Sequence, residues 1–330
     1  MAQEDEGSGE DRLIATYFRP IATHPGAFGL TDDCAAIAPP PGCDLVLKTD
    51  GVIGGVHFFV EDPPDAVARK ALRINLSDLA AKGAEPLGFT LGLVLPDDWT
   101  AEWLAAFAAG LGDDAAAYRC PLIGGDTVRT SGPLTLSIAA LGAVAPGSFA
   151  ARGGVRAGDR LYVTGTIGDA AFGLLQRTGK GPALGEADRR WLLDRYLLPQ
   201  PRLALAPVVA RFASGGMDVS DGFVGDLTKM LRVSGVTAKI EMTRLPLSPA
   251  ASAAIAADPS LFPLAATGGD DYELILAVPA AATAGFEAAA ATAGVAVTAI
   301  GEAMAGEGAP RFVDQEGRTF KFARGSFSHF

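Results

Sequence analysis

Carboxylates beside glycine or a small polar residue recur along this chain, and any fold it adopts has to place them. The motifs are Thr31-Asp32-Asp33, Thr49-Asp50-Gly51, Asn75-Leu76-Ser77-Asp78, Gly124-Gly125-Asp126-Thr127, Asp218-Val219-Ser220-Asp221-Gly222 and Gly268-Gly269-Asp270-Asp271-Tyr272-Glu273. Carboxylate oxygens are ligands that Mg²⁺ prefers, and glycine lets a phosphate approach where a Cβ would block it. Converging carboxylates without a counter-ion repel by roughly 4 kcal/mol per close pair at an effective dielectric of about 20. The pattern therefore predicts a metal-dependent enzyme that handles phosphates.

Length and charge narrow the class of protein. The 330 residues exceed what one hydrophobic core usually organises, so two domains are expected. A net charge of −11 argues against nucleic acid or an anionic membrane as a partner. Cys34, Cys43 and Cys120 show no CxxC spacing, which favours reduced thiols over a disulfide framework or a zinc site. With no signal-peptide pattern and no apolar run long enough to span a bilayer, we expect a cytoplasmic protein.

The order of predicted elements is that of an α+β protein with two domains. Residues 1–10 are expected to form a disordered tail, and the segment 145–148 predicts a boundary between domains 1–148 and 149–330. Strands are predicted over 45–49, 56–60, 89–95, 134–144, 161–164, 236–241, 272–278 and 295–300. Helices are predicted over 13–18, 64–83, 100–118, 169–178, 186–197, 201–213 and 280–293, and after Asp221.

The chain lacks two common nucleotide-binding signatures, those of the Walker type and of the protein kinases. Gly179-Lys180 lacks the spacing of a Walker sequence, and the kinase-type glycine-rich loop is missing. Taken singly, each acidic motif also has a structural interpretation, because Asp50-Gly51 could form a turn and Asp218 or Asp221 could cap a helix. Likewise, His57 could be a satisfied core or edge histidine, and Arg152 either a phosphate clamp or a solvated linker residue. The six acidic motifs are distributed over both halves of the chain, which weakens a purely structural explanation of all of them.

The motifs occur in an order that resembles one known family. Besides the acidic motifs, the resemblance includes Gly55-Val56-His57-Phe58, Lys70-Ala71-Leu72, Leu79-Ala80-Ala81, Leu274 and the terminal His329-Phe330. Together they resemble the thiamine-monophosphate kinases, which share a superfamily with aminoimidazole ribonucleotide synthetase and selenophosphate synthetase. The resemblance covers nearly the whole chain. It implies an N-terminal α+β domain for ATP and Mg²⁺ binding, whose sheet pairs with a second copy in a dimer barrel, and a C-terminal α+β domain closing the active site.

The resemblance also implies roles for individual residues. Several Mg²⁺ ions would be bound by Asp33, Thr49, Asp50, Asp78, Asp126, Asp218 and Asp221. ATP would be contacted by Gly125, Asp126, Arg152 and Ser220. Thiamine monophosphate would be contacted by His57, Asp270 and Phe327. Lys48 stands where similar sequences often have a small hydroxyl residue.

The implied reaction is direct in-line transfer of the γ-phosphoryl group of ATP to thiamine monophosphate, giving thiamine diphosphate. A phosphate monoester has a second pKa of about 6, so the acceptor is largely a dianion at neutral pH and needs no general base. What the reaction needs is charge shielding between two polyanions. The alternatives are another ATP-dependent synthetase of the superfamily and a non-catalytic divalent-metal-binding protein. A selenophosphate synthetase would carry a reactive cysteine near the N-terminus, whereas no cysteine precedes Cys34.

Overall fold

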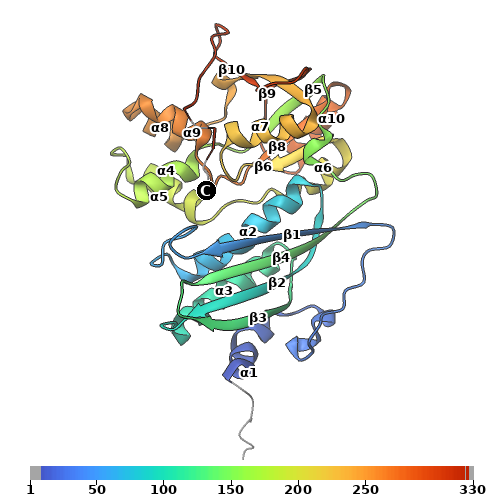
Figure 1. The fold of residues 1–330 in the computed structure, drawn as a ribbon, viewed down its shortest axis with the longest axis vertical. Helices are drawn as coiled ribbons and strands as arrows, with labels where there is room; N and C mark the ends of the chain where they lie inside the picture. Colours follow the sequence, from blue (N-terminus) through green and yellow to red (C-terminus); the bar gives the residue numbers. More distant parts are fainter. Residues whose placement is uncertain (1–8, 324, 327–330) are drawn as a thin grey trace, which may run out of the picture. The chain divides into compact units, whose positions relative to one another are not determined.

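The structure is a computed structural model that describes residues 9–323, 325 and 326. The chain forms two compact units, each with its own β-sheet and helices, so the fold is α+β as predicted (Figure 1). Unit 1 comprises residues 1–75 and 86–143, and unit 2 comprises 76–85 and 144–330. The predicted tail lies mostly outside the described residues, but its last two residues, Gly9 and Glu10, begin α1 (Gly9–Leu13) and are helical. Helicity there continues through a π-helical turn over Ile14–Phe18, inside the predicted 13–18 helix.

Unit 1 is built on a four-stranded sheet in the order β1-β4-β2-β3. Its strands are β1 (Asp44–Ile53), β2 (Glu85–Pro96), β3 (Leu122–Thr130) and β4 (Thr135–Val144). On β2, Leu91, Leu93 and Leu95 are buried while the residues between them are half-buried, the alternation expected when one face packs on a core. In this order β1 and β3 are the two edge strands of the sheet.

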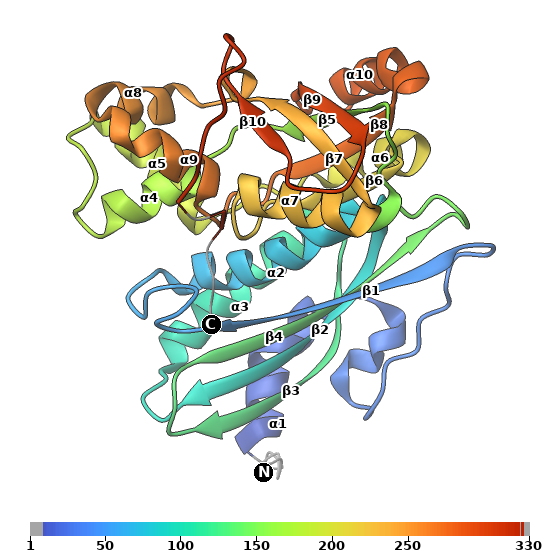
Figure 2. The same cartoon turned by 45° about the horizontal axis from the view of Figure 1, so that its top comes forward.

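Helices cover one face of this sheet (Figure 2). They are α2 (Pro64–Ala81) and α3 (Ala101–Ala117), preceded by the short turns Arg19–Ile21 and Pro25–Leu30. Proline begins α2 as predicted, and Thr100 caps α3 by accepting the N–H of Trp103 at 3.1 Å. Buried Asp114 on α3 binds Arg73 on α2 through N–O contacts of 2.6 and 3.0 Å. These pairs fix the two helices against each other.

In unit 1 one predicted strand is absent and one observed strand was not predicted. Residues 56–60 do not form a strand, because the chain reverses after β1: the N–H of His57 donates to the Ile53 carbonyl at 2.9 Å, and that of Gly55 to the Phe58 carbonyl at 2.8 Å. β3 was not predicted at all. Its Gly124-Gly125 pair resembles a turn in sequence, but β3 pairs in parallel with β2 from Phe89 to Pro96.

Unit 2 is built on a six-stranded sheet in the order β10-β7-β9-β5-β8-β6. Its strands are β5 (Asp159–Thr164), β6 (Gly215–Asp218), β7 (Val236–Glu241), β8 (Leu274–Pro279), β9 (Val297–Ala305) and β10 (Arg311–Val313). β10 runs parallel to β7, and the other neighbours are antiparallel. Leu274 to Val278 of β8 are all fully buried, which matches the unbroken apolar run of this strand. β6 and β10 were missed because they are too short to show a period.

The helices of unit 2 lie around this sheet and at one end of it (Figure 1). They are α4 (Asp169–Arg177), α5 (Glu186–Leu197), α6 (Ala206–Phe212), α7 (Phe223–Ser234), α8 (Pro249–Ala257), α9 (Phe262–Thr267) and α10 (Thr283–Thr292). Short turns occupy Arg152–Gly154, Leu203–Leu205, Met242–Arg244, Pro259–Leu261 and Ala280–Ala282. α8 and α9 were not predicted.

The last part of α2 belongs to unit 2 by its contacts. Ser77 Oγ donates to the Tyr272 carbonyl at 3.2 Å, and Lys82 Nζ to the Gly216 carbonyl at 2.6 Å. Buried Ala80 and Ala81 join a core cluster with residues of β5, β8 and α10. The chain passes from unit 1 to unit 2 after residue 143, and the domain boundary at residue 148 stays a prediction. Among the described residues, no helix is both long and apolar enough to span a membrane.

Candidate active site

Two acidic loops of unit 2 lie side by side. The first, residues 218–222, begins at the last residue of β6, and the second, residues 268–273, precedes β8, which pairs with β6. Backbone hydrogen bonds join them: Asp270 N–H to Ser220 carbonyl at 2.9 Å, Tyr272 N–H to Val219 carbonyl at 2.9 Å, and Val219 N–H to Glu273 carbonyl at 2.8 Å. The structure therefore brings together the loops that carry the predicted residues Asp218, Ser220, Asp221 and Asp270.

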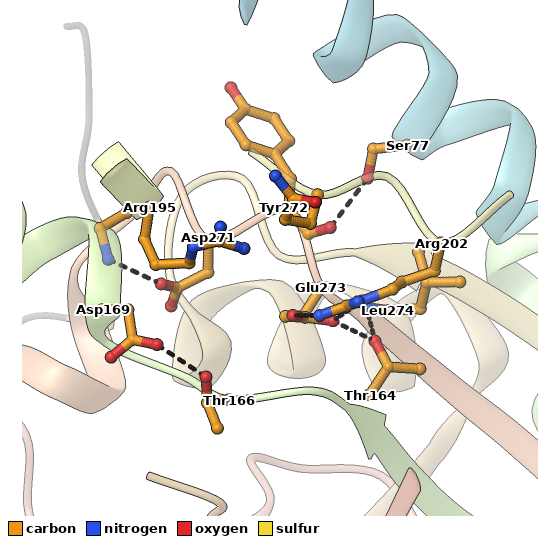
Figure 3. A network of polar contacts seen from close by, with 12 residues as sticks. Ser77, Thr164, Thr166, Asp169, Arg195, Arg202, Asp271, Tyr272, Glu273 and Leu274 are labelled. Atoms are coloured by element: carbon orange, nitrogen blue, oxygen red, sulfur yellow. Dashed lines mark hydrogen bonds and ion pairs between the residues drawn. The ribbon is translucent and has the colours of Figure 1, made fainter. Parts of the chain in front are cut away.

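The three carboxylates of the second loop have different positions. Asp271 and Glu273 are buried, whereas Asp270 is half-buried. Asp271 accepts the N–H groups of Gly168 at 2.7 Å and Ala170 at 3.1 Å, at the start of α4 (Figure 3). Burial raises the pKa of Asp271 well above its ordinary value, while the two backbone donors act in the opposite direction. Asp271 thus anchors the loop, and Asp270 is its accessible carboxylate.

Glu273 is the second anchor of this loop. Its Oε2 accepts from Arg202 Nε at 2.7 Å and from Thr164 Oγ1 at 2.6 Å, and its Oε1 pairs with the Arg202 guanidinium (Figure 3). A bidentate arginine pair is geometrically specific, and removing one buried partner usually costs about 3–5 kcal/mol. Asp270, just before the first anchor, and Tyr272, between the two anchors, have φ values of +73° and +51°. Such values are uncommon for residues with a Cβ and cluster at functional sites.

Asp226, on the first turn of α7, organises the first loop. Its Oδ2 accepts three consecutive backbone N–H groups, those of Ser220 at 3.1 Å, Asp221 at 2.8 Å and Gly222 at 3.1 Å. Burial raises the pKa of Asp226, opposed by Lys229 and by the Asp221 N–H. Gly222 has φ +130°, and a Cβ there would lie 2.5 Å from the Thr267 carbonyl oxygen, so the turn requires glycine.

Lys229 places a cation between the carboxylates of this loop. Its Nζ lies 2.5 Å from Asp221 Oδ2 and 3.1 Å from Asp226 Oδ1. Burial tends to lower the pKa of Lys229, but its bonds to the two aspartates outweigh burial and the net shift is upward. Asp221, a predicted metal ligand, is therefore held by a lysine in this structure.

Replacing Asp226 by alanine is expected to lower the free energy of unfolding by about 2 kcal/mol, because buried N–H groups lose their acceptor. Turnover should fall as well, since Ser220 and Asp221 lose their fixed orientation. Asp226→Asn is the matched control, because its amide oxygen can still accept these N–H groups. Urea unfolding and steady-state kinetics measure the two effects. Equal stability of wild type and Asp226→Ala would contradict the anchoring role.

The predicted residues Asp78 and Arg152 have different relations to these loops. Asp78 follows Ser77, whose Oγ bonds the Tyr272 carbonyl at 3.2 Å, so its helical turn lies against the second loop. Arg152 is exposed and lies elsewhere: its carbonyl accepts from Ser234 Oγ at 3.2 Å, at the far end of α7. The twelve residues of α7 span roughly 16 Å from one end to the other. A ligand contacting both Ser220 and Arg152 would have to lie along α7.

In unit 1, Thr49 and Asp50 are consecutive on β1, so their side chains leave opposite faces of the strand. Thr49 Oγ1 donates to the Ile138 carbonyl of β4 at 3.0 Å. Asp50 Oδ1 pairs with Lys48 Nζ at 2.9 Å. Lys48 thus neutralises a predicted metal ligand on the same face, as Lys229 does for Asp221.

Asp126 lies on β3, where it pairs with Gly92 of β2 and is exposed. A Cβ on Gly125 would approach the Leu91 carbonyl oxygen to 2.1 Å, so glycine is required there by the close approach of β2. Because β1 and β3 are opposite edges, Asp50 and Asp126 are separated by three strand spacings, roughly 14 Å. One chain therefore does not bring Asp50 and Asp126 to a common ion.

Of the remaining predicted residues, Asp33 and His57 lie in loops. Asp33 is exposed, three residues after the end of the helical turn at Leu30. His57 follows β1, and its Nδ1 accepts the Ile53 N–H at 3.0 Å. A neutral His57 therefore carries its proton on Nε2, which makes that atom a donor. Phe327 lies outside the described residues.

The predicted ligands fit Mg²⁺ by chemistry, because every one offers oxygen and the loops of unit 2 set several of them side by side. No three His, Cys, Asp or Glu side chains within 9–323, 325 and 326 are close enough to hold a metal ion. Within unit 1, Asp50 and Asp126 lie on opposite edges of one sheet, so they do not converge. Asp226 and Arg202 were missed by sequence reasoning, while Asp271 and Glu273 belong to a quoted acidic motif but were given no role. The acidic first turn of α7 and the Asp226–Lys229 spacing hinted at Asp226.

Comparison with known proteins places the chain in a family. The models for the N-terminal and C-terminal domains of AIR synthase related proteins match residues 31–144 and 156–313. A thiamine-monophosphate kinase of Caulobacter vibrioides is 43% identical over 299 residues, covering 89% of this chain and 84% of that protein. The chain belongs to the thiamine-monophosphate kinase family. The Escherichia coli K12 member is 38% identical, covering 90% of this chain and 91% of its own.

Solved structures of this family share the fold. The thiamine-monophosphate kinase of Stenotrophomonas maltophilia has a TM-score of 0.82 at 35% identity, covering 96% of this chain and 98% of its own. The complex described as AaThiL with AMPPCP and TMP has a TM-score of 0.76 at 28% identity, covering 92% and 97% of the two chains. The resemblance found in the sequence is thereby confirmed, and this chain is a kinase of that family.

Proposed function

We propose that this protein phosphorylates thiamine monophosphate with ATP, forming thiamine diphosphate and ADP. Its membership of the thiamine-monophosphate kinase family supports this, as does the similarity to a relative described in complex with AMPPCP and TMP. The single structural observation that carries it is the pair of adjoining loops in unit 2, which carry Asp218, Asp221 and Asp270. A merely metal-binding protein would not need the anchored, strained loop of Asp270 and Tyr272.

The residues of this chain position and shield the reactants. Asp33, Thr49, Asp50, Asp78, Asp126, Asp218 and Asp221 would hold Mg²⁺ ions, which supply neutralisation of phosphate charge when bound. Ser220, Gly125 and Arg152 would contact ATP, with the nucleotide lying along α7. His57 would donate from Nε2 to the acceptor phosphate, and Asp270 would contact the substrate. No residue is assigned as a general base, because the acceptor is already a dianion near neutral pH.

A second copy of the chain would allow Asp50 of one copy and Asp126 of the other to reach the same site. We propose a homodimer in which the β1 edge of one sheet lies beside the β3 edge of the other, as in a closed barrel. Exposed apolar side chains near both edges support it: Leu45 and Leu47 on β1 are 54% and 70% exposed, and Val128 on β3 is 44% exposed. In this arrangement each active site would take Asp50 from one copy and Asp126 from the other. We further propose that the enzyme acts in the cytoplasm.

The test of the proposed function is incubation with ATP, Mg²⁺ and thiamine monophosphate, followed by separation of the thiamine phosphates. Thiamine diphosphate and ADP are expected in equal amounts. Excess chelator should reduce turnover to background, because the carboxylates and the triphosphate repel each other without a divalent ion. Full turnover in chelator would contradict the metal role, and ATP hydrolysis without thiamine diphosphate would contradict the acceptor.

A further inference from the structure

Two of the proposed Mg²⁺ ligands are each paired with a lysine of the same unit. In unit 2, Lys229 Nζ lies 2.5 Å from Asp221 Oδ2. In unit 1, Lys48 Nζ lies 2.9 Å from Asp50 Oδ1. All four side chains are between 29% and 35% exposed, so each pair is partly shielded from water and can still be reached by an ion from solvent. An ammonium group and Mg²⁺ bind the same kind of oxygen, so each carboxylate is a target for two cations.

The charge around Lys229 explains why a cation is held there. The two loops of the candidate site, residues 218–222 and 268–273, contain five Asp or Glu residues and no Lys or Arg. Neighbouring carboxylates repel one another, and the repulsion is stronger where water is partly excluded. Lys229 extends from α7 to the first of these loops and brings one positive charge to it.

Asp226 keeps Lys229 in place, whereas Asp221 can leave it. Asp226 Oδ1 lies 3.1 Å from Lys229 Nζ, and the two residues are three apart on one face of α7. The Asp226 side chain is 1% exposed and its other oxygen accepts three backbone N–H groups, so it is not free to turn away. The Asp221 side chain is 34% exposed and has room to rotate. An exchange of partners at this pair therefore needs movement of Asp221 alone.

The pair in unit 1 has a similar arrangement on a strand. Lys48 and Asp50 are two residues apart on β1, so their side chains leave the same face. Between them Thr49 Oγ1 donates to the Ile138 carbonyl at 3.0 Å, which fixes this part of β1 against β4. The backbone thus holds the ammonium group next to the carboxylate, and rotation of the side chains is what separates them.

We propose that both lysines are internal counter-cations: each competes with Mg²⁺ for its aspartate and so sets the Mg²⁺ concentration at which that carboxylate binds metal. The inference rests on the proposed function for the assignment of the two aspartates as metal ligands. A divalent ion that binds either aspartate displaces an ammonium group and then lies near its positive charge, and both effects weaken binding. At low Mg²⁺ concentration the same lysine neutralises the aspartate and reduces repulsion among the carboxylates.

Calorimetric titration of the nucleotide-free protein with MgCl₂ tests the competition without turnover. Lys229→Met keeps the length of the side chain and removes its charge, and it should tighten Mg²⁺ binding roughly fivefold. Lys229→Arg keeps the charge and should stay within about twofold of the wild type. Arg232→Met is the matched control, because Arg232 is exposed on the same helix and forms no ion pair within the part of the chain that the structure describes. Unchanged or weaker Mg²⁺ binding by Lys229→Met would overturn the proposal for this lysine.

A double-mutant cycle separates competition for the aspartate from a general effect of charge. In an Asp221→Asn background no carboxylate is left to compete for, so adding Lys229→Met should change Mg²⁺ affinity by less than about twofold. A gain of roughly fivefold that persists in this background would overturn the competition. Lys48→Met, alone and with Asp50→Asn, repeats the cycle in unit 1. It decides the matter if Lys229→Met does not fold, because both members of that pair are partly exposed on an edge strand.

Thermal unfolding supplies a second measurement that needs no nucleotide. An ion that binds only the folded state raises Tm more when it binds more tightly. The rise in Tm on adding MgCl₂ should therefore be larger for Lys229→Met than for the wild type. The Tm without added metal should be lower in this variant, because buried Asp226 loses its cation. An equal or smaller rise would contradict the proposal.

Kinetics relate the two lysines to the reaction. The Mg²⁺ concentration that gives half-maximal turnover should be lower for Lys229→Met than for the wild type. If the wild type makes thiamine diphosphate but Lys229→Met and Lys48→Met bind Mg²⁺ no more tightly, the counter-cation proposal is wrong and the proposed function stands. If both variants bind Mg²⁺ more tightly but the wild type makes no thiamine diphosphate, the proposed function is wrong and the counter-cation role stands.

Discussion

Replacing Asp126 by asparagine is expected to lower turnover by roughly a hundredfold or more, because a proposed ligand of the Mg²⁺ that would neutralise the phosphate charge is lost. The fold should be unaffected, since Asp126 is exposed on an edge strand. Asp78→Asn should behave in the same way. Asp44→Asn, an exposed aspartate at the start of β1, is the matched control and should keep wild-type turnover. Retention of more than about a tenth of wild-type turnover by Asp126→Asn would contradict its role.

Mixing two inactive variants extends this test to the dimer. If Asp50 and Asp126 of one site come from different copies, an Asp50→Asn copy paired with an Asp126→Asn copy has one site with both native ligands. Random mixing of the two variants should therefore restore roughly a quarter of the wild-type sites. Neither variant alone should recover. Mixed dimers, verified with two affinity tags, that stay inactive would contradict the β1-to-β3 arrangement.

Unphosphorylated thiamine is expected to be a far poorer acceptor than its monophosphate, by roughly a hundredfold or more. Its hydroxyl must lose a proton during attack, and general-base catalysis, typically worth 10²–10⁴-fold, is assigned to no residue here. Loss of the phosphate would also remove the proposed contact to His57 Nε2. Initial rates with both acceptors under saturating ATP measure the ratio. Comparable rates would refute direct phosphate-to-phosphate transfer.

The same mechanism fixes the direction of the pH dependence. As pH falls through the monoester's second pKa of about 6, the dianion fraction and hence the rate should fall. His57→Asn should keep this acid limb at weaker substrate affinity, because His57 only donates a hydrogen bond. Loss of the acid limb in that variant would make His57 the titrating catalyst instead.

Sequence periodicity predicted the elements whose side chains show a clear pattern. α2 was predicted from Pro64 and its apolar spacing, and β8 from an unbroken apolar run. β3 was missed because Gly124-Gly125 is typical of a turn, while in the fold the missing Cβ lets β2 approach. Residues 56–60 look like a strand by composition, but hydrogen bonds to Ile53 reverse the chain there. Such contacts are set by the tertiary structure and leave no periodic signal.

Only those residues of the candidate site that belong to recognisable sequence motifs were given a predicted role. Asp218, Asp221 and Asp270 come from adjoining loops, which pairing of β6 with β8 explains. Asp226 and Glu273 were given no role, because their partners are backbone N–H groups and an arginine 71 residues away in sequence. A carboxylate that anchors a loop and one that binds a ligand look alike in a sequence. Only burial and hydrogen-bond partners separate them.

The division of α2 between the two units has a practical consequence for dissecting the protein. Residues 76–85 continue the chain of the first unit but have their contacts in the second. A fragment cut at residue 148 would leave the apolar side chains of Ala80 and Ala81 without the core cluster that buries them. The two halves are therefore poor candidates for separate expression, and cooperative unfolding of the whole chain should be easier to observe than independent melting of its parts.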